Sequence, residues 1–424
     1  MSEAYNFLLK VQDLLQSKAA PLAGKINAER HISALKDTIL SIEPLMLLGG
    51  FALVLARRPV AANWSQTLMI LYHLTIGLLS LFTVIVLAYQ LCKSYNLDPV
   101  LGSSSALLTF LSLAVPTVAP GQTNPNGLFL AAEFLGVKGF FSAIILGLLT
   151  VEVVRLLDIK GVKVRMPESV PPVVAVPLNA FIPVIINVVL FMSLNSIMMR
   201  FWGVDIPQAV LNLMTPLTNT MDSMGIVILA ALLINILWFF GIHGGSVVQS
   251  LLIPFLTFNF AANAQAVELG KPLPHIFSGN FFYTFVNIGG SGAALSLALA
   301  MLIVARSEQL KGISRNGFLS VIFGISETFV FGTPIIMNPT LFIPFVVLPM
   351  LNAVLAYLAV AFHLVGGVYL YLPVNTPGLI AAFLSTMDWQ AVLLWMIILG
   401  IDIIVYIPFI KSYDRKLLTK EIEN

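Results

Sequence analysis

An acidic residue, Glu327, stands alone in an apolar part of the sequence. It lies in FGISETFVFGTPIIMNPTLFIP, where no Lys or Arg is nearer than Arg315. An acid at the lipid-facing centre of a membrane helix costs about 3 kcal/mol, so such residues normally face the protein interior. A structural hydrogen bond to a helix end would satisfy Glu327, but a site for a polar ligand or a proton is favoured.

Helix-breaking residues surround this acid on both sides. Gly324 precedes it, and Gly332, Pro334 and Pro339 follow it. Interrupted backbone at membrane depth is tolerated where it lines a cavity. The segment therefore predicts a hairpin that carries the carboxylate into a cavity.

Two further motifs place polar groups among glycines. His243 lies in WFFGIHGGSVVQS, where Gly244 and Gly245 would allow a ligand to approach the backbone closely, although a histidine satisfied within the fold is an alternative. Asn287 and Ser291 lie in FVNIGGSGAALSLAL, whose glycines indicate either a pocket wall or close helix packing.

The composition indicates that these residues are positioned by membrane helices. Hydrophobic residues make up 58% of the 424 residues and charged residues only 10%, against about 25% charged in a soluble domain. The net charge of +2 and the absence of a long basic run exclude a nucleic-acid partner. A single cysteine, Cys92, excludes a disulfide framework and a thiolate metal cluster, and we expect neither a metal nor a cofactor.

The expected fold is an all-α polytopic membrane protein with about ten transmembrane helices and two re-entrant hairpins in the C-terminal half. A spanning helix needs about 20 mostly apolar residues. Nine such runs occur, at about 39–56, 68–92, 101–118, 139–157, 174–199, 225–241, 282–304, 335–362 and 391–410. The segments 243–260 and 317–334 are apolar but broken, and we predict that they form the hairpins.

The distribution of residue types divides the chain into four parts. Residues 1–38 form an amphipathic terminus without the features of a cleavable signal, and residues 39–215 contain long uninterrupted apolar runs. Residues 216–410 are punctuated by Gly, Asn, Pro and Thr, and we expect function there. Basic residues collect within 155–165, within 306–315 and in the tail 411–424. The positive-inside rule therefore puts both termini in the cytoplasm.

The sequence resembles a known family over nearly its full length. The strings that carry the resemblance include RHISALKDTILSIEPLMLLGG, GVKGFFSAIILGLLTVEVVRLL, MPESVPPVVAVPLNAFIP, WFFGIHG, FVNIGGSG, GISETFVFGTPIIMNP and IPFIKSYDRKLL, in the family's order. They resemble the membrane IIC components of lactose, cellobiose and diacetylchitobiose phosphotransferase permeases. The chain departs from the family at Thr328, where the family usually has Pro after the glutamate.

The resemblance implies a bacterial cell-membrane subunit that binds and translocates a disaccharide. It implies a homodimer formed by residues 39–215 and a sugar chamber formed by residues 216–410. Phosphate would come from a phosphocysteine on a separate IIB protein, itself supplied by a IIA protein, so this chain carries no phosphorylated residue itself. Cellobiose is the first expectation for the sugar, followed by diacetylchitobiose and lactose.

The resemblance implies that His243 and Glu327 correspond to a histidine and a glutamate that the family conserves, and we hypothesise roles for individual residues from there. Glu327 would act as the catalytic base for a sugar hydroxyl, and His243, beside Gly244, would orient that hydroxyl or share its proton. The expected substrate-binding residues are Asn287, Asn338, Thr333, Trp389 and Gly244, with Trp389 stacking on a sugar ring.

Two other classes of protein share parts of this pattern. An ion-coupled secondary sugar transporter would also have a buried acid, but no inverted repeat is legible in the sequence. A membrane receptor or scaffold would not need a polar, glycine-broken second half.

Overall fold

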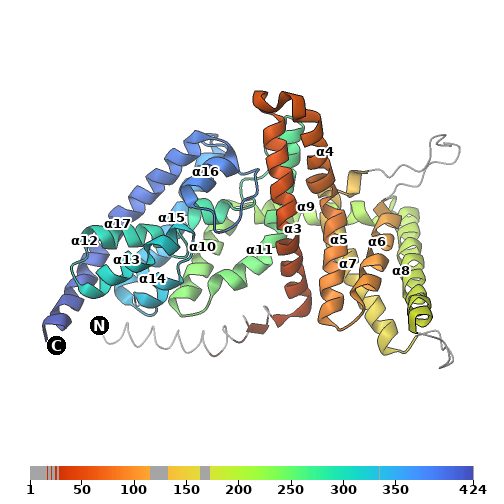
Figure 1. The fold of residues 1–424 in the computed structure, drawn as a ribbon, viewed down its shortest axis with the longest axis horizontal. Helices are drawn as coiled ribbons and strands as arrows, with labels where there is room; N and C mark the ends of the chain where they lie inside the picture. Colours follow the sequence, from red (N-terminus) through yellow and green to blue (C-terminus); the bar gives the residue numbers. More distant parts are fainter. Residues whose placement is uncertain are drawn as a thin grey trace. The chain divides into compact units, whose positions relative to one another are not determined.

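The computed structural model describes residues 28–114, 132–162, 172–333 and 335–423, with a few isolated positions among the first 27. Every element in this part of the chain is helical (Figure 1), which confirms the expected all-α fold. Two compact units are formed, Glu29–Thr218 and Asn219–Asn424, and the second also includes Met1–Ala28.

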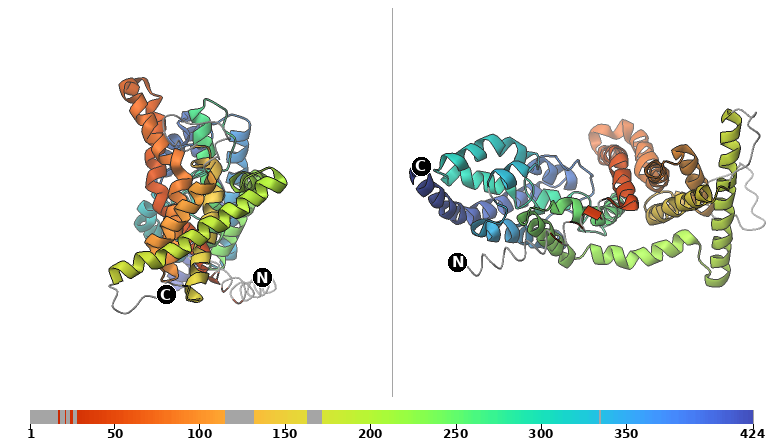
Figure 2. Two further views of the ribbon diagram at one scale, coloured as in Figure 1. Left: turned by 90° about the vertical axis from the view of Figure 1, so that its right-hand side faces the viewer. Right: turned by 90° about the horizontal axis from the view of Figure 1, so that it is seen from below.

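The first unit is a bundle around one central helix. Helix α5 (Leu79–Ser94) packs against α3 (Arg30–Ala56), α6 (Pro99–Ala114) and α7 (Phe140–Ile159). Helix α8 (Pro172–Trp202) packs on α6 and α7 and crosses them obliquely (Figure 2). The unit also contains η2 (Pro59–Trp64), α4 (Ser65–Thr75), η3 (Ile76–Leu78), η4 (Ala132–Phe134), η5 (Val137–Gly139) and most of α9 (Ile206–Met221).

Charged side chains join the start of α3 to the end of α7. His31 Nε2 lies 3.0 Å from Glu152 Oε1, and Arg155 donates a 3.0 Å hydrogen bond to Glu152 Oε2. The Arg155 guanidinium also lies 4.2 Å from the centre of the Tyr95 ring. Burial and the neighbouring Glu152 raise the pKa of Tyr95 to about 12, so this phenol stays protonated. These contacts place residues 29–31 and 152–155 at the same end of the first unit.

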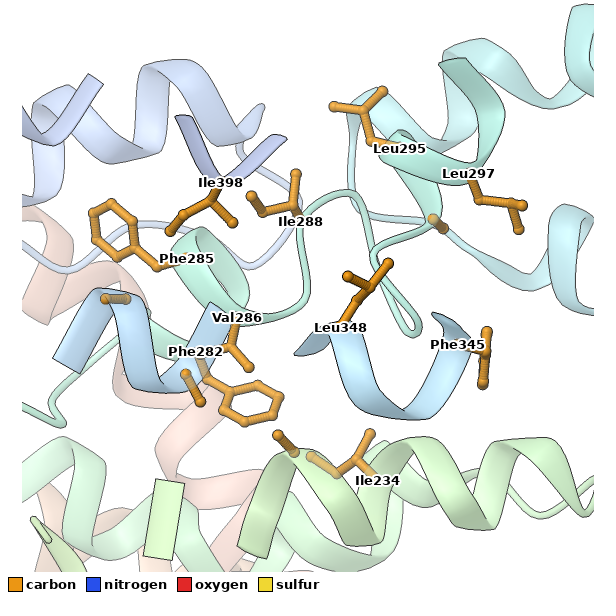
Figure 3. Close-up of a cluster of buried hydrophobic side chains, with 14 of the residues drawn as sticks. Ile234, Phe282, Phe285, Val286, Ile288, Leu295, Leu297, Phe345, Leu348 and Ile398 are labelled. Atoms are coloured by element: carbon orange, nitrogen blue, oxygen red, sulfur yellow. The ribbon is translucent and has the colours of Figure 1, made fainter. Parts of the chain in front are cut away.

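The second unit is built around α10 (Met224–Phe239), α15 (Pro339–Ala361) and the short π-helix η6 (Phe282–Val286). Figure 3 shows the apolar contacts at its centre, where Phe282 and Val286 belong to one buried cluster with Ile234 of α10 and Leu348 of α15. Around this core lie α11 (Gly244–Glu268), α12 (Ala294–Val304), α13 (Glu308–Ile322), α14 (Glu327–Gly332), α16 (Gly378–Thr386) and α17 (Trp389–Glu423).

Among the described residues, seven helices are long and apolar enough to cross a membrane, or eight when the broken pair α9 and α10 is counted as one span. Two shorter apolar helices, α6 and α12, add to these. The predicted number was about ten, and the difference arises because some predicted runs are short or broken.

The breaks do not all lie where the sequence predicted them. The segment 243–260, expected to be a hairpin, is part of the continuous helix α11, because Gly244 and Gly245 occupy its first turn and only Pro254 lies inside it. The segment 282–304, expected to be one span, is instead interrupted between η6 and α12. The segment 317–334 is broken as expected, by the turn between α13 and α14.

Candidate functional site

A polar cavity of about 290 Å³ lies within the second unit, where several helix breaks meet. Its walls come from the α10–α11 junction, η6 and the loop after it, the α13–α14 turn, and the loop before α16. The lining residues are Trp238, His243, Gly245, Gln249, Tyr283, Asn287, Gly290, Ser291, Gly324, Ile325, Ser326, Glu327, Val374 and Asn375.

His243 is oriented by its position as the N-cap of α11. Its Nδ1 accepts a 3.0 Å hydrogen bond from the backbone N–H of Ser246, so an uncharged ring must carry its proton on Nε2. The Trp238 ring packs against the imidazole with ring centroids 4.5 Å apart. These two contacts direct the Nε2–H of His243 toward the carboxylate of Glu327, with Nε2 and Oε1 3.9 Å apart.

Glu327 is the first residue of α14 and follows the turn at Gly324, whose φ is +77°. The side chains of His243 and Glu327 are 56% and 47% exposed, so both reach the open space of the cavity. No hydrogen bond from a donor in the described part of the chain reaches the Glu327 carboxylate. Its oxygens are therefore available to a ligand hydroxyl.

Asn287 is held in place by a buried amide behind it. Asn235 donates a 3.2 Å hydrogen bond to Asn287 Oδ1 and accepts a 2.7 Å hydrogen bond from the backbone N–H of Gly292. The Tyr406 hydroxyl of α17 donates to the carbonyl of the same glycine. These bonds fix both ends of the loop 287–293.

A second buried network supports the C-terminal end of η6. Asn352 donates hydrogen bonds to the Val286 carbonyl at 3.2 Å and to Asp402 Oδ2 at 2.9 Å. Ser296 also donates to Asp402 Oδ2, at 3.3 Å. Because Asn352, Asp402 and Ser296 are fully buried, they support the cavity wall without facing the cavity.

The two loops that carry Asn287 and Glu327 touch each other directly. The Ser291 backbone N–H donates a 3.2 Å hydrogen bond to Ser326 Oγ. Gly290 has a φ of +110°, and a Cβ on it would lie 2.6 Å from Ser326 Cβ and 2.9 Å from the Gly324 carbonyl. Only glycine fits this contact.

Three of the predicted site residues, His243, Asn287 and Glu327, meet in this cavity. Gly244 does not line it: a Cβ there would lie 2.2 Å from the Ile234 carbonyl, so this glycine serves helix packing, and Gly245 lines the cavity instead.

The other three predicted residues lie outside the cavity lining. Asn338 is the N-cap of α15, where its Oδ1 accepts from the Thr340 N–H. Thr333 is buried against Met301. Trp389 is exposed at the start of α17.

Sequence reasoning missed Gln249, Tyr283 and Asn375. The Tyr283 hydroxyl donates to Gln249 Oε1, which joins η6 to α11 across the cavity. A weak indication of Tyr283 was present in the sequence, because this residue lies about one helical turn before the predicted site residue Asn287. Asn375 lies in YLPVNTPG, whose two prolines indicate a turn.

A helical membrane protein with a cavity lined by a carboxylate, an imidazole and amides belongs to the class of membrane proteins that bind small polar solutes. Comparison with known proteins defines the family. The model of the family described as "Phosphotransferase system, EIIC" matches residues 36–349. The chain therefore belongs to this family and is a multi-pass membrane protein.

Individual relatives match nearly end to end. The lichenan permease IIC component of Bacillus subtilis (strain 168) is 30% identical, over 97% of this chain and 95% of the relative. The cellobiose-specific EIIC component of Geobacillus stearothermophilus is 31% identical, over 96% and 95%. The crystal structure of ChbC, the IIC component of an N,N′-diacetylchitobiose-specific phosphotransferase system, matches with a TM-score of 0.87 at 30% identity, over 96% of this chain and 99% of that one.

Membership of the family distinguishes between the classes that the sequence left open. Components of this family work with IIA and IIB partners and bind sugar in the membrane. The alternative of an ion-coupled secondary transporter finds no support in these comparisons.

Proposed function

We propose that the protein binds a disaccharide in the cavity of the second unit, carries it across the bacterial plasma membrane, and presents it to a separate phosphorylated IIB protein. The observation that carries this proposal is the facing pair of His243 Nε2 and Glu327 Oε1, 3.9 Å apart at the cavity surface. The relatives named for cellobiose and diacetylchitobiose favour a β-linked disaccharide, with cellobiose as first choice.

A sugar hydroxyl fits between these two side chains. An oxygen about 2.8 Å from each group would accept the Nε2–H of His243 and donate its own hydrogen to the Glu327 carboxylate. The lone pair freed in this way attacks the phosphorus of the IIB phosphocysteine. The new O–P bond forms as the S–P bond breaks, the thiolate leaves, and Glu327 keeps the proton. Positioning accounts for most of the catalysis in such a transfer.

Asn287, Gln249 and Asn375 supply amides for the other hydroxyls. Asn287 Oδ1 already accepts from Asn235, so the ligand meets the Asn287 amino group as a donor. The Trp238 ring, packed on His243, gives one apolar surface near the sugar.

Orientation and assembly follow from the first unit and the basic residues. Both termini are placed in the cytoplasm by the positive-inside rule. Helix α8 exposes large apolar side chains along its length, among them Phe181, Val189 and Phe201. In the homodimer that we propose for the first half of the chain, a second copy would cover part of this surface. Cross-linking of single cysteines along α8 in membranes would test that contact.

The chemical form of the imported sugar tests the function. Cells that contain the matching IIA and IIB proteins take up radiolabelled cellobiose, and we expect the label inside to be cellobiose phosphate. Recovery of free cellobiose at the same rate in cells without IIB would contradict the proposal and would support ion-coupled transport.

A further inference from the structure

A second cavity, of about 480 Å³, lies in the second unit where α12 ends beside the last turns of α17. It is distinct from the sugar cavity and shares none of its lining residues. Its lining residues are Ile303, Val304, Ala305, Arg306, Lys411, Asp414, Arg415 and Leu418.

Three basic side chains line this cavity without ion-pair partners. Arg306, Lys411 and Arg415 are exposed, and none of them lies within 4.0 Å of a carboxylate in the described part of the chain. The carboxylate of Asp414 is already engaged, because its two oxygens accept the backbone N–H groups of Arg306 and Ser307 at 2.8 and 2.9 Å. The cavity therefore combines three cations with a single carboxylate and presents a net positive charge to an anionic ligand.

The cavity lies at the level where both helices change from apolar to charged. The apolar helix α12 ends at Val304 and Arg306 follows, while on α17 the charged sequence begins at Lys411. In a helix that crosses a bilayer, this change marks the depth of the lipid phosphate groups.

Exposed apolar side chains continue from the cations along both helices. Ile303 on α12 is 64% exposed, and Ile404 on α17 is 70% exposed. Ile397, Ile404, Lys411 and Leu418 follow one another at seven-residue spacing, so they share one face of α17. This face provides an apolar track that leads to a basic end, which matches an acyl chain and a phosphate head group.

We propose that this cavity binds an anionic phospholipid, with its phosphate between Arg306, Lys411 and Arg415 and an acyl chain along Ile303 and Ile404. A soluble phosphate would not use the apolar track. An acidic protein surface would not need a cavity at the membrane boundary.

Lipid binding to the purified full-length protein tests the proposal. Native mass spectrometry would compare phosphatidylglycerol with phosphatidylcholine of the same acyl chains. Each basic residue near an anionic head group contributes about a factor of five in affinity. We therefore expect Lys411→Gln with Arg415→Gln to weaken phosphatidylglycerol binding about 25-fold and to leave phosphatidylcholine unchanged.

A matched variant removes the same charge elsewhere. Lys271→Gln with Arg315→Gln alters two exposed cations of the same unit outside this cavity and should keep the wild-type preference. If Lys411→Gln with Arg415→Gln also keeps the wild-type preference for phosphatidylglycerol, the proposal is wrong. Loss of phosphoryl transfer from IIB in that variant would then identify a protein docking surface instead. Competition by sn-glycerol 3-phosphate as strong as that of the lipid would also overturn it, because the ligand would then be a free phosphate. The lipid-binding and competition measurements do not depend on sugar.

Discussion

The Glu327 carboxylate faces the cavity and accepts no hydrogen bond from the residues that the structure describes, so its charge is available for chemistry. Glu327→Gln keeps the size of the side chain but removes the base. We expect sugar binding to change little, while phosphoryl transfer falls by about 10² or more, the scale of general-base loss. Calorimetry with the sugar and a transfer assay with phosphorylated IIB would give the two values. Glu308→Gln, on the exposed face of α13, is the control and should alter neither. Transfer at the wild-type rate in Glu327→Gln would show that the carboxylate is not the base.

His243 combines a structural role with a site role, and two substitutions separate them. His243→Ala removes both the cap of α11 and the Nε2–H, whereas His243→Asn keeps a side chain that caps helices well. We expect both variants to lose sugar affinity by about 1–3 kcal/mol, because a hydroxyl is left unpaired. Only His243→Ala should also lower the thermal unfolding temperature. If His243→Asn kept the wild-type sugar affinity, His243 would act only as the cap of α11.

The residues that sequence could identify are those out of place in an apolar context. Glu327 and His243 stand out because each is costly in a membrane unless it is used. Gln249 and Asn375 have no such contrast, since polar residues near helix ends are common. Trp389 and Trp238 look equivalent as amphipathic aromatics, and only the fold of the α10–α11 junction, where Trp238 packs on His243, puts Trp238 at the cavity.

At the scale of elements, the close contact between the loop 287–293 and the α13–α14 turn depends on Gly290. Gly290→Ala forces a methyl group against Ser326 at a φ of +110°. We expect the loops to separate and sugar binding to be lost, with a fall in thermal stability. Gly312→Ala is the matched control, because nothing lies within 4 Å of that position in α13 and alanine favours a helix by up to about 1 kcal/mol. Unchanged sugar affinity in Gly290→Ala would contradict the described contact.

Thr328 occupies the second position of α14, where a backbone N–H has no partner within the helix. Proline is therefore compatible with the helix, but it restricts the backbone of the preceding residue, Glu327. We expect Thr328→Pro to insert and assemble as the wild type does and to change sugar affinity modestly. Fluorescence-detected chromatography and calorimetry would measure these two properties. Loss of expression would mean that the surrounding structure requires threonine.

The type of element could be predicted more reliably than its breaks. Long apolar runs specify membrane helices through composition alone, so most spans were predicted from the sequence. Glycines were ambiguous: Gly244 and Gly245 looked like breakers but begin α11, whereas Gly289, Gly290 and Gly292 adopt positive φ and do break their segment. The difference depends on which atoms approach each glycine, and this is a tertiary property.

At the scale of the whole molecule, the first unit allows a direct test of orientation. The contacts of His31 with Glu152 put the start of α3 at the same end as Arg155 and Lys160, so Arg57 and Arg58, which follow α3, lie at the opposite end. In a Cys92→Ala background, Lys160→Cys should resist a membrane-impermeant maleimide on intact cells, and Arg58→Cys should react. Labelling of Lys160→Cys together with protection of Arg58→Cys would show that the topology is the inverse of the one proposed.

The hydrogen bond from Asn235 to Asn287 also bears on how the protein could be redesigned. Two kinds of cavity-lining residue could be substituted to change the sugar that the protein binds. Asn287 is bonded to a buried amide that also holds Gly292, so replacing it would disturb the loop as well as the contact. Asn375 lies on the loop before α16, and its side chain makes no hydrogen bond to another residue in the described part of the chain. Variation at Asn375 is therefore the safer starting point for a library of altered specificities.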